Sequence, residues 1–229
     1  MPLRHLLTVV AGALLLAACG KPPKAQTATL DSPKAAPDSA LQRADLARIQ
    51  GSPSAKVWLV IASDFQCPYC REFHDDSYKR ILKDYVATGK VRVAYLNHPM
   101  AAHIHAVVSA EAAMCAGTQD RFWAMHDGLF ATQAHWSQLQ NPQPVFDSLA
   151  TSLQLRLSDW RACMTSHQLR PMIEADDART RAGGVTGTPS FFIDNKLAVV
   201  GVQPYGNFRA ALDSAVARAG PPGRGSQLP

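Results

Sequence analysis

The hydrophobic and polar positions of this chain first predict a strand, a helix and a second strand. Unbroken apolar runs at 57–62 and 91–96 are typical of strands that are buried on both faces of a sheet. Between them, the apolar residues of 68–85 fall on one face of a helix. This order predicts a βαβ unit.

The pattern then becomes helical, from about residue 102 to about residue 183. It predicts helices over 105–116, 120–131, 145–153, a short segment that Ser158 caps, and 172–182. Strand character returns at 191–193 and 197–201, and a last helix is expected over 205–219. We therefore predict an α/β fold in which an all-helical insertion interrupts a frame that contains a sheet.

Both ends of the chain have a composition that does not predict a packed structure. Residues 19–45 are rich in Pro, Ala, Lys, Thr and Ser and show no periodicity, which predicts a disordered tether. Residues 220–229 predict a disordered tail for the same reason. The folded domain is expected at 46–219, which is long enough for one domain with an insertion.

The first residues have the pattern of an export signal. A positively charged start is followed by the apolar run 6–18, which is too short to cross a membrane. Small residues then precede Cys19, as in the lipobox of bacterial lipoproteins, where the cysteine carries the lipid. An ordinary signal peptide is the alternative. We expect 1–18 to be a lipoprotein signal peptide and Cys19 to be the lipidation site.

This signal predicts a location at the periplasmic or extracytoplasmic face, with the protein held to a membrane by its lipid. Gly20 follows the cysteine, where an aspartate would favour the inner membrane in many Gram-negative lipoproteins. The outer membrane is therefore preferred over the inner. The net charge of +5 is a small excess, and no basic run with interleaved aromatic residues indicates nucleic-acid binding.

Two residues separate Cys67 from Cys70, and the pair comes directly after the first predicted strand. Cys67 then lies at a helix N-terminus, where unpaired N–H groups and the helix dipole favour an anion. A lowered thiol pKa follows, and the thiolate is the reactive form. Pro68 suits the first helical position, because its missing N–H is not needed there. The pattern is typical of thiol–disulfide exchange; an inert bridge and half of a zinc site are the alternatives.

Two of the five cysteines, Cys115 and Cys163, then remain without a role. In an oxidising compartment a leftover pair usually forms a disulfide. A metal-binding pair is the other interpretation, but no second cysteine or histidine stands at zinc-ligand spacing from either one. We also expect no metal site among the histidines, since His103 and His105 would point away from each other on a helix.

Four blocks of the sequence, in this order, resemble the DsbA-like family of the thioredoxin superfamily, in its thioredoxin-like domain 4 branch. The blocks are 63–73, 103–116, 120–130 and 187–193. The resemblance implies a thioredoxin fold whose helical insertion, at about 102–183, separates a βαβ half from a ββα half. It also implies that Thr188-Pro189 is the cis-proline loop that faces the redox cysteines, and that Cys115 and Cys163 form a structural disulfide.

The resemblance also implies an activity, that of a protein thiol–disulfide oxidoreductase acting on exported proteins. Cys67 would be the exposed sulfur that is attacked, and Cys70 the buried, resolving thiol. Pro68 and Tyr69 would tune the pair, and Thr188 would abut the disulfide. The Cys67–Cys70 disulfide is itself the redox group, so no cofactor is implied.

The direction of electron flow stays open. A quinone-linked membrane oxidase of the DsbB or VKOR type would recycle an oxidase, whereas a DsbD-type donor would drive a reductase or isomerase like DsbG. Thr188 is typical of the reductase and isomerase members, since oxidases tend to have valine there. From another class comes a copper-handling lipoprotein that is not an enzyme and uses the two thiols as soft ligands, with His74 as the nearest further ligand.

One position departs from the family pattern. Many members carry a buried acidic residue six positions before the first active cysteine, where it relays a proton. Here that residue is Ile61. Asp64 is three positions before Cys67, so we expect it to cap or orient the turn into the helix instead.

Overall fold

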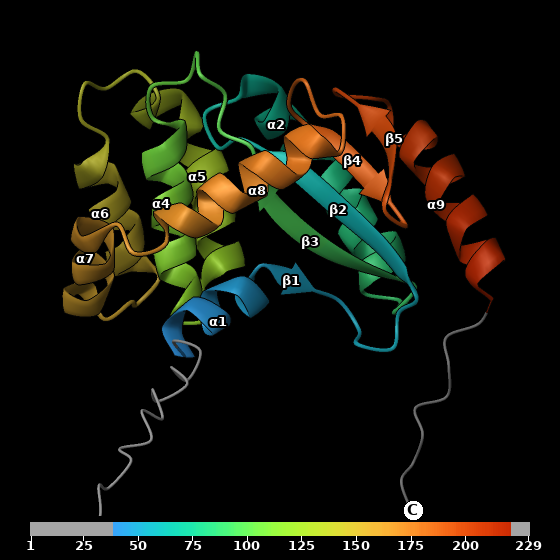
Figure 1. Ribbon diagram of the computed structural model, residues 1–229, viewed down its shortest axis with the longest axis horizontal. Helices are drawn as coiled ribbons and strands as arrows, with labels where there is room; N and C mark the ends of the chain where they lie inside the picture. The colour runs from blue at the N-terminus through green and yellow to red at the C-terminus, as the bar shows by residue number, and fades with distance from the viewer. Residues whose placement is uncertain (1–38, 221–229) are drawn as a thin grey trace, which may run out of the picture. The chain divides into compact units, whose positions relative to one another are not determined.

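A five-stranded sheet runs through the part of the chain that this computed structural model describes, residues 39–220 (Figure 1). Its strands are β1 (Ile49–Gln50), β2 (Val57–Ser63), β3 (Val91–Asn97), β4 (Ser190–Ile193) and β5 (Lys196–Val200). They lie in the order β1-β3-β2-β4-β5, and only β2 and β3 run parallel. The predicted α/β class and the thioredoxin fold are confirmed.

One long helical segment connects β2 to β3. It consists of α2 (Pro68–Phe73), the π-helical turn η1 (His74–Tyr78), α3 (Lys79–Ile81) and a second π-helical turn, η2 (Leu82–Val86). Phe73 packs against Phe191 of β4 and Phe208 of the last helix, α9 (Tyr205–Ala219). These contacts hold α2 against the sheet, with its first turn at the end of β2.

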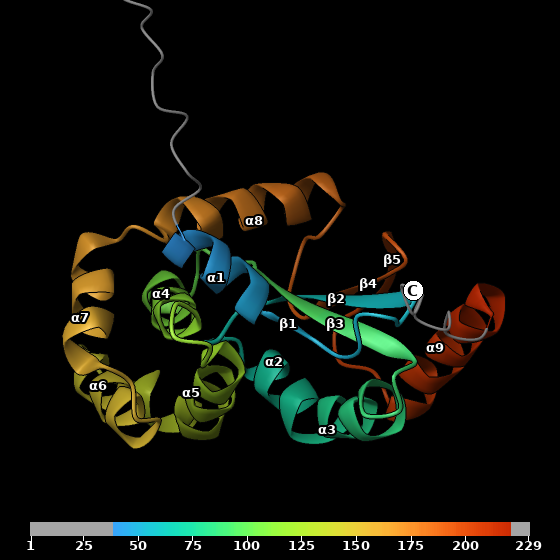
Figure 2. The same cartoon turned by 90° about the horizontal axis from the view of Figure 1, so that it is seen from below.

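The insertion is entirely helical, as predicted. It contains α4 (Ala106–Gly117), α5 (Phe122–Trp136), α6 (Gln143–Ser152), α7 (Leu157–Ser166) and α8 (Arg170–Ala182). In Figure 2, α2 and α3 cover one face of the sheet and α8 crosses the other. The prediction that Ser158 caps α7 is wrong, because Arg156 holds the cap position with extended backbone.

The buried apolar residues form two clusters. One joins the helices of the insertion, and the other joins the sheet to α2, α3 and α9. Phe65, Tyr95 and both cysteines of the Cys-Pro-Tyr-Cys pair belong to the insertion cluster, although they come from the βαβ unit. The pair therefore lies where the two halves of the domain meet.

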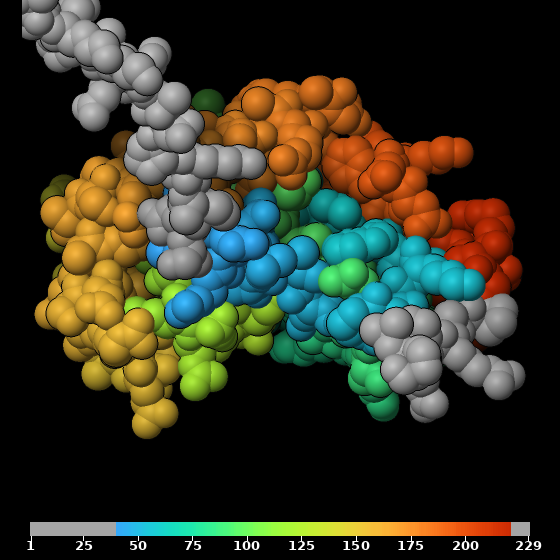
Figure 3. Space-filling model, turned by 60° about the horizontal axis from the view of Figure 1, so that its bottom comes forward, coloured from blue at the N-terminus to red at the C-terminus, as the bar shows by residue number. Residues whose placement is uncertain are grey.

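The folded domain begins earlier than predicted. Residues up to 45 were expected in a disordered tether, but α1 (Ser39–Ala47) is a helix that packs against α4. Figure 3 shows this start of the domain in blue, beside the green surface of the insertion. Ala44 is fully buried there, and a Cβ at Gly117 would lie 3.3 Å from its Cα. The buried Arg48 side chain, just after α1, pairs with Asp176 of α8. Close packing of small residues and this ion pair hold α1, without a strong apolar stripe.

Several sequence predictions lie outside the described residues. They are the signal peptide 1–18, the lipidation site Cys19, the rest of the tether up to residue 38, and the tail after residue 220. Within 39–220, no helix combines the length and the apolar character that crossing a membrane requires.

Candidate active site

The turn from β2 into α2 carries both cysteines of the pair. Cys67 is the N-cap of α2 and has extended backbone, and Pro68 occupies the first turn after it. The Cys67 N–H donates to the Asp64 carbonyl at 3.1 Å, which closes the turn. Cys70 follows one turn into the helix, and both residues are free thiols.

The predicted exposure of Cys67 is wrong. Only 4% of its surface is exposed, against 1% for Cys70. The reason is the loop before β4, since the Cys67 thiol donates to the Thr188 carbonyl at 3.4 Å. A partner must therefore approach the sulfur past this loop.

The two thiols differ sharply in acidity. A hydrogen bond from the Cys70 thiol is the largest effect on Cys67 and lowers its pKa to about 6. The Thr188 side chain and the N–H groups of Tyr69 and Cys70 lower it further, whereas burial opposes them. Burial raises the pKa of Cys70 well above its ordinary value, and the neighbouring Cys67 raises it again. One thiol is poised as a thiolate at neutral pH and the other is held protonated.

Beneath Cys70 lie two hydroxyl groups that the sequence analysis did not single out. Tyr95 of β3 pairs in register with Ile61 of β2, and Ser63 is two residues further along the same face. The Ser63 hydroxyl lowers the pKa of Cys70, and the Cys70 charge adds to burial in raising the pKa of Tyr95. The Tyr95 hydroxyl is buried and has no well-formed hydrogen bond among the described residues.

The bond between Thr188 and Pro189 is cis. Pro189 leads directly into β4, and its carbonyl accepts the Gly201 N–H at 2.8 Å. Because Ser190 of β4 pairs with Ala62 of β2, this loop lies opposite the N-terminus of α2. The structure thus brings the predicted residues Thr188 and Pro189 to the two cysteines.

Tyr69 lies between the two buried cysteines and is well exposed, at 61%. With Thr188, Val202 and Pro204 it lines a groove of about 540 Å³. The groove runs along one side of the pair, and its open shape leaves room for an extended peptide segment.

Asp64 orients the loop behind the pair, as its position before Cys67 suggested. Its buried carboxylate accepts the Gln66 N–H at 2.7 Å, the Met100 N–H at 2.9 Å and a contact from His103 Nδ1 at 2.7 Å. Because it turns away into these bonds, it does not replace the acidic side chain that is absent at Ile61.

The insertion holds the turn from its other side. Gln133 of α5 is buried, and its Nε2 donates to the Phe65 carbonyl at 2.7 Å and to the Cys67 carbonyl at 2.9 Å. The Gln66 side chain accepts the His105 N–H at 2.6 Å. Gln133 was missed from the sequence, because the predicted helix ended at residue 131, whereas α5 continues to Trp136.

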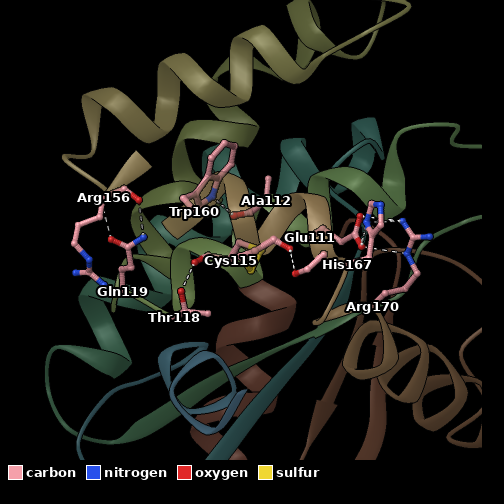
Figure 4. The surroundings of a disulfide bond; sticks show 11 residues. Glu111, Ala112, Cys115, Thr118, Gln119, Arg156, Trp160, His167 and Arg170 are labelled. Atoms are coloured by element: carbon pink, nitrogen blue, oxygen red, sulfur yellow. Dashed lines mark hydrogen bonds and ion pairs between the residues drawn. A yellow bond between two sulfur atoms is a disulfide. The ribbon is translucent and has the colours of Figure 1, made fainter. Parts of the chain in front are cut away.

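Cys115 and Cys163 form a disulfide that joins α4 to α7, with an S–S distance of 2.01 Å (Figure 4). Trp160 packs beside it, and its Nε1 donates to the Ala112 carbonyl at 3.2 Å. The bridge lies inside the insertion, and its cysteines are separate from Cys67 and Cys70.

The folded part of the chain matches known proteins. Residues 44–214 match the family model described as Thioredoxin. The solved structure of oxidised BdbD from Bacillus subtilis superimposes with a TM-score of 0.66 at 20% identity, covering 74% of this chain and 92% of that one. At this identity the likeness shows the fold alone.

Two curated relatives differ greatly in length. Disulfide bond formation protein D of Bacillus subtilis is 23% identical over 153 residues, which is 65% of this chain and 68% of that protein. Na(+)/H(+) antiporter NhaA 1 of Salinispora arenicola is 31% identical over 177 residues, 76% of this chain but only 25% of the antiporter. This chain thus spans about a quarter of the antiporter it matches.

Proposed function

Because this chain belongs to the thioredoxin family and is built like its DsbA-like members, we propose that it catalyses thiol–disulfide exchange with exported proteins through Cys67 and Cys70. The observation that carries the proposal is the asymmetry of the two thiols. A pKa of about 6 for Cys67 and a raised pKa for Cys70 are what a reactive and a resolving thiol require. The curated relative from Bacillus subtilis and the fold are in keeping with it.

In the oxidising direction the reaction begins at the Cys67–Cys70 disulfide. A substrate thiolate attacks the Cys67 sulfur, a new S–S bond forms there, and the bond to Cys70 breaks. The electron pair leaves on the Cys70 sulfur. The Ser63 hydroxyl then stabilises this buried thiolate until it takes up a proton. We propose the same role for the Tyr95 hydroxyl, whose pKa the Cys70 charge raises.

A second substrate thiolate completes the exchange. It attacks the substrate sulfur of the mixed disulfide, so that Cys67 departs as a thiolate and the substrate gains a disulfide. The helix N-terminus and the Thr188 side chain stabilise that leaving thiolate. Two electrons have then passed from the substrate to the Cys67–Cys70 pair.

The groove beside Tyr69 supports an extended, unfolded polypeptide as the substrate. It adjoins Thr188, which contacts the Cys67 sulfur, so a bound peptide can present its own cysteine there. Glu72 and Asp76 also line the groove, so it favours substrate segments that carry no acidic side chain at that point.

For the direction of electron flow we propose oxidation. A stabilised Cys67 thiolate favours the reduced enzyme, and a disulfide with a stable reduced form is a strong oxidant. A membrane oxidase of the DsbB or VKOR type would then recycle the pair. Thr188 favours the alternative, a reductase or isomerase recharged by a DsbD-type donor. A reduction potential measured against glutathione distinguishes the two.

For the location we propose the periplasmic or extracytoplasmic face of a membrane, with a lipid on Cys19. The support is the sequence alone: the apolar run 6–18 and the small residues before the cysteine. An anchored enzyme with a tether before α1 would meet exported chains as they emerge.

The proposed function is tested by oxidative refolding of a reduced, unfolded protein whose activity requires disulfides. The enzyme should accelerate recovery, and Cys67→Ser should abolish the effect. Cys70→Ser should instead accumulate mixed disulfides through Cys67, which non-reducing gels reveal. Recovery that is as fast with Cys67→Ser as with the parent protein would refute thiol–disulfide exchange at this pair.

A further inference from the structure

Three side chains with metal-ligating atoms meet where the redox helix packs against the insertion. His74 begins η1, directly after α2, and His126 and Asp127 lie next to each other in α5. Nε2 of His74 lies 3.1 Å and Nδ1 of His126 lies 2.8 Å from the same oxygen, Asp127 Oδ1. All three ligand atoms lie within 4.8 Å of one another.

Hydrogen bonds alone do not satisfy both ring nitrogens of a neutral His74. Its Nδ1 lies 3.0 Å from Asp75 Oδ1, and its Nε2 faces Asp127 Oδ1. A neutral imidazole has a single N–H, so one of these contacts sets a ring lone pair against a carboxylate oxygen. A cation between Nε2 and Asp127 removes that repulsion, with the N–H on Nδ1 then donating to Asp75.

The arrangement fits a transition metal. Zinc binds histidine nitrogen and carboxylate oxygen at roughly 2.0–2.2 Å, and tetrahedral geometry then separates the ligand atoms by about 3.3 Å. The separations of 3.1 and 2.8 Å between the histidine nitrogens and Asp127 Oδ1 need only a small expansion. Asp75, on the far nitrogen of His74, is the kind of outer carboxylate that fixes the orientation of metal-bound histidines.

Burial and access also suit a metal ion. The side chains of His74 and His126 are 8% and 4% exposed, and aromatic rings including those of Tyr78, Trp123 and Phe130 surround them. Asp127 is 57% exposed, so the site opens to solvent on that side.

We propose that His74, His126 and Asp127 bind one zinc ion, or a transition metal ion of similar preference, with water as the fourth ligand. The ion connects the helix that carries Cys70 to α5, which carries Gln133. The two redox thiols take no part, since within residues 39–220 the three side chains are the one group of this kind and neither cysteine belongs to it. The site is a proposal independent of the exchange reaction.

The test uses the full chain with Cys67→Ser and Cys70→Ser, so that thiols cannot bind the metal. Zinc sulfate is titrated in competition with a chromophoric chelator, and one ion per chain is expected. Asp75→Asn removes an outer partner and should weaken zinc binding by about tenfold. Asp127→Asn removes a direct ligand and should weaken zinc binding by more than that. Asp76→Asn, an equally exposed acid on η1 that pairs with Arg80, is the matched control and should change nothing.

A second measurement separates metal binding from damage to the fold. Zinc should raise the unfolding temperature of the parent chain but not that of Asp127→Asn or His74→Gln. Circular dichroism in the presence of chelator verifies that the variants are folded. Absence of zinc binding, or equal binding by the parent and Asp127→Asn, would overturn the proposal.

Discussion

Cys67 and Cys70 lie three residues apart, yet their sulfur atoms meet opposite conditions. Cys67 has donors around it, namely the Cys70 thiol and two N–H groups of the first helical turn. Cys70 is enclosed by apolar side chains and has few donors. The difference comes from one turn of helix, which moves the second sulfur from the helix end into the junction of the two cores.

This difference has a pH dependence that can be measured. The pKa of Cys67 is about 6 in the folded, reduced protein, below that of an unfolded thiol, which is about 8.5. The thiolate therefore stabilises the reduced fold at high pH, and that contribution is lost as the pH falls through 6. Between pH 6 and pH 8, denaturant unfolding should show the reduced form gaining stability relative to the disulfide form.

The same assignment predicts the effect of Cys70→Ala. The hydrogen bond from Cys70 is the largest cause of the lowered pKa, so its removal should raise the pKa of Cys67. The rate of alkylation by iodoacetamide as a function of pH reports this value. A profile that is the same in the variant and in the parent would mean that the helix end alone activates Cys67.

The unpaired hydroxyl of Tyr95 leads to a second prediction at this scale. A buried hydroxyl without a partner costs about 1–3 kcal/mol of stability, so Tyr95→Phe should leave the fold as stable as the parent or more stable. If the hydroxyl stabilises the Cys70 thiolate, exchange should slow by roughly tenfold or more, since hydrogen bonds to charged groups contribute about 1.5–3 kcal/mol. Stopped-flow kinetics and denaturant unfolding measure the two effects.

Tyr85→Phe is the matched control. Its hydroxyl donates to Asp213 at 2.6 Å and lies among α9 residues, outside the insertion core that holds the pair. This change should cost about 1 kcal/mol of stability and leave the exchange rate unaltered. If Tyr95→Phe exchanged as fast as the parent, the hydroxyl would have no part in the reaction.

At the scale of elements, the disulfide between α4 and α7 is the main covalent link within the insertion. It closes a span of 48 residues, and a loop of that size is worth about 4 kcal/mol in the chain-entropy account. The double variant Cys115→Ala/Cys163→Ala should lose about that much free energy of unfolding. Its exchange rate at low temperature should remain that of the parent, because the bridge is separate from Cys67.

The order in which the two disulfides are reduced tests the structural role of the Cys115–Cys163 bridge. In the parent, graded reductant followed by alkylation and peptide mapping should modify the Cys67–Cys70 pair first. If Cys115 and Cys163 are alkylated together with that pair under mild reductant, the bridge is not the buried, structural link assigned to it.

Helix α5 acts on the redox turn through a single amide. In Gln133→Leu, the Phe65 carbonyl loses the Gln133 donor and the Cys67 carbonyl keeps only the Arg71 N–H at 3.3 Å, so the fold should be destabilised by about 1–3 kcal/mol. Gln138→Leu, on an exposed position just after α5, should change stability by less than about 0.5 kcal/mol. Chemical denaturation of both variants distinguishes the loss of the Gln133 hydrogen bonds from a general effect of replacing glutamine with leucine.

The elements also show what the sequence could predict. The apolar runs of β2 and β3 and the helical pattern after residue 102 led to the correct α/β class with a helical insertion. α1 was missed because small residues and the ion pair of Arg48 hold it, and these leave a weak apolar stripe. β1, with two residues, is too short to have a pattern.

The candidate site divides in the same way. Cys67, Cys70 and the Thr188-Pro189 loop have local sequence signals, so they could be identified without the structure. Tyr95 could not, since its hydroxyl is relevant only because α2 places the Cys70 sulfur close to it. The expectation of no metal site rested on spacing along the chain, and spacing does not reveal that His74 and His126 meet.

At the scale of the whole molecule, the proposed lipid anchor should affect where the protein is located but not how fast it exchanges disulfides. Cys19→Ala should release the protein from membranes, while the purified variant keeps the exchange rate of the parent, since the described domain begins only at α1. Cell fractionation and mass spectrometry of the mature N-terminus provide the measurement. A mature N-terminus other than a lipid-modified Cys19 would exclude the anchor.

The hold of Gln133 on the turn before α2 bears on how such proteins can change over evolution or in the laboratory. An accessory module that merely sits beside a catalytic frame can be exchanged for another, because the frame works without it. Here the inserted helical segment donates hydrogen bonds to the turn that precedes α2 and contains Cys67. Recombination at residues 102 and 183 should therefore fail unless the incoming segment carries an equivalent amide, so the two halves of this enzyme are inherited together.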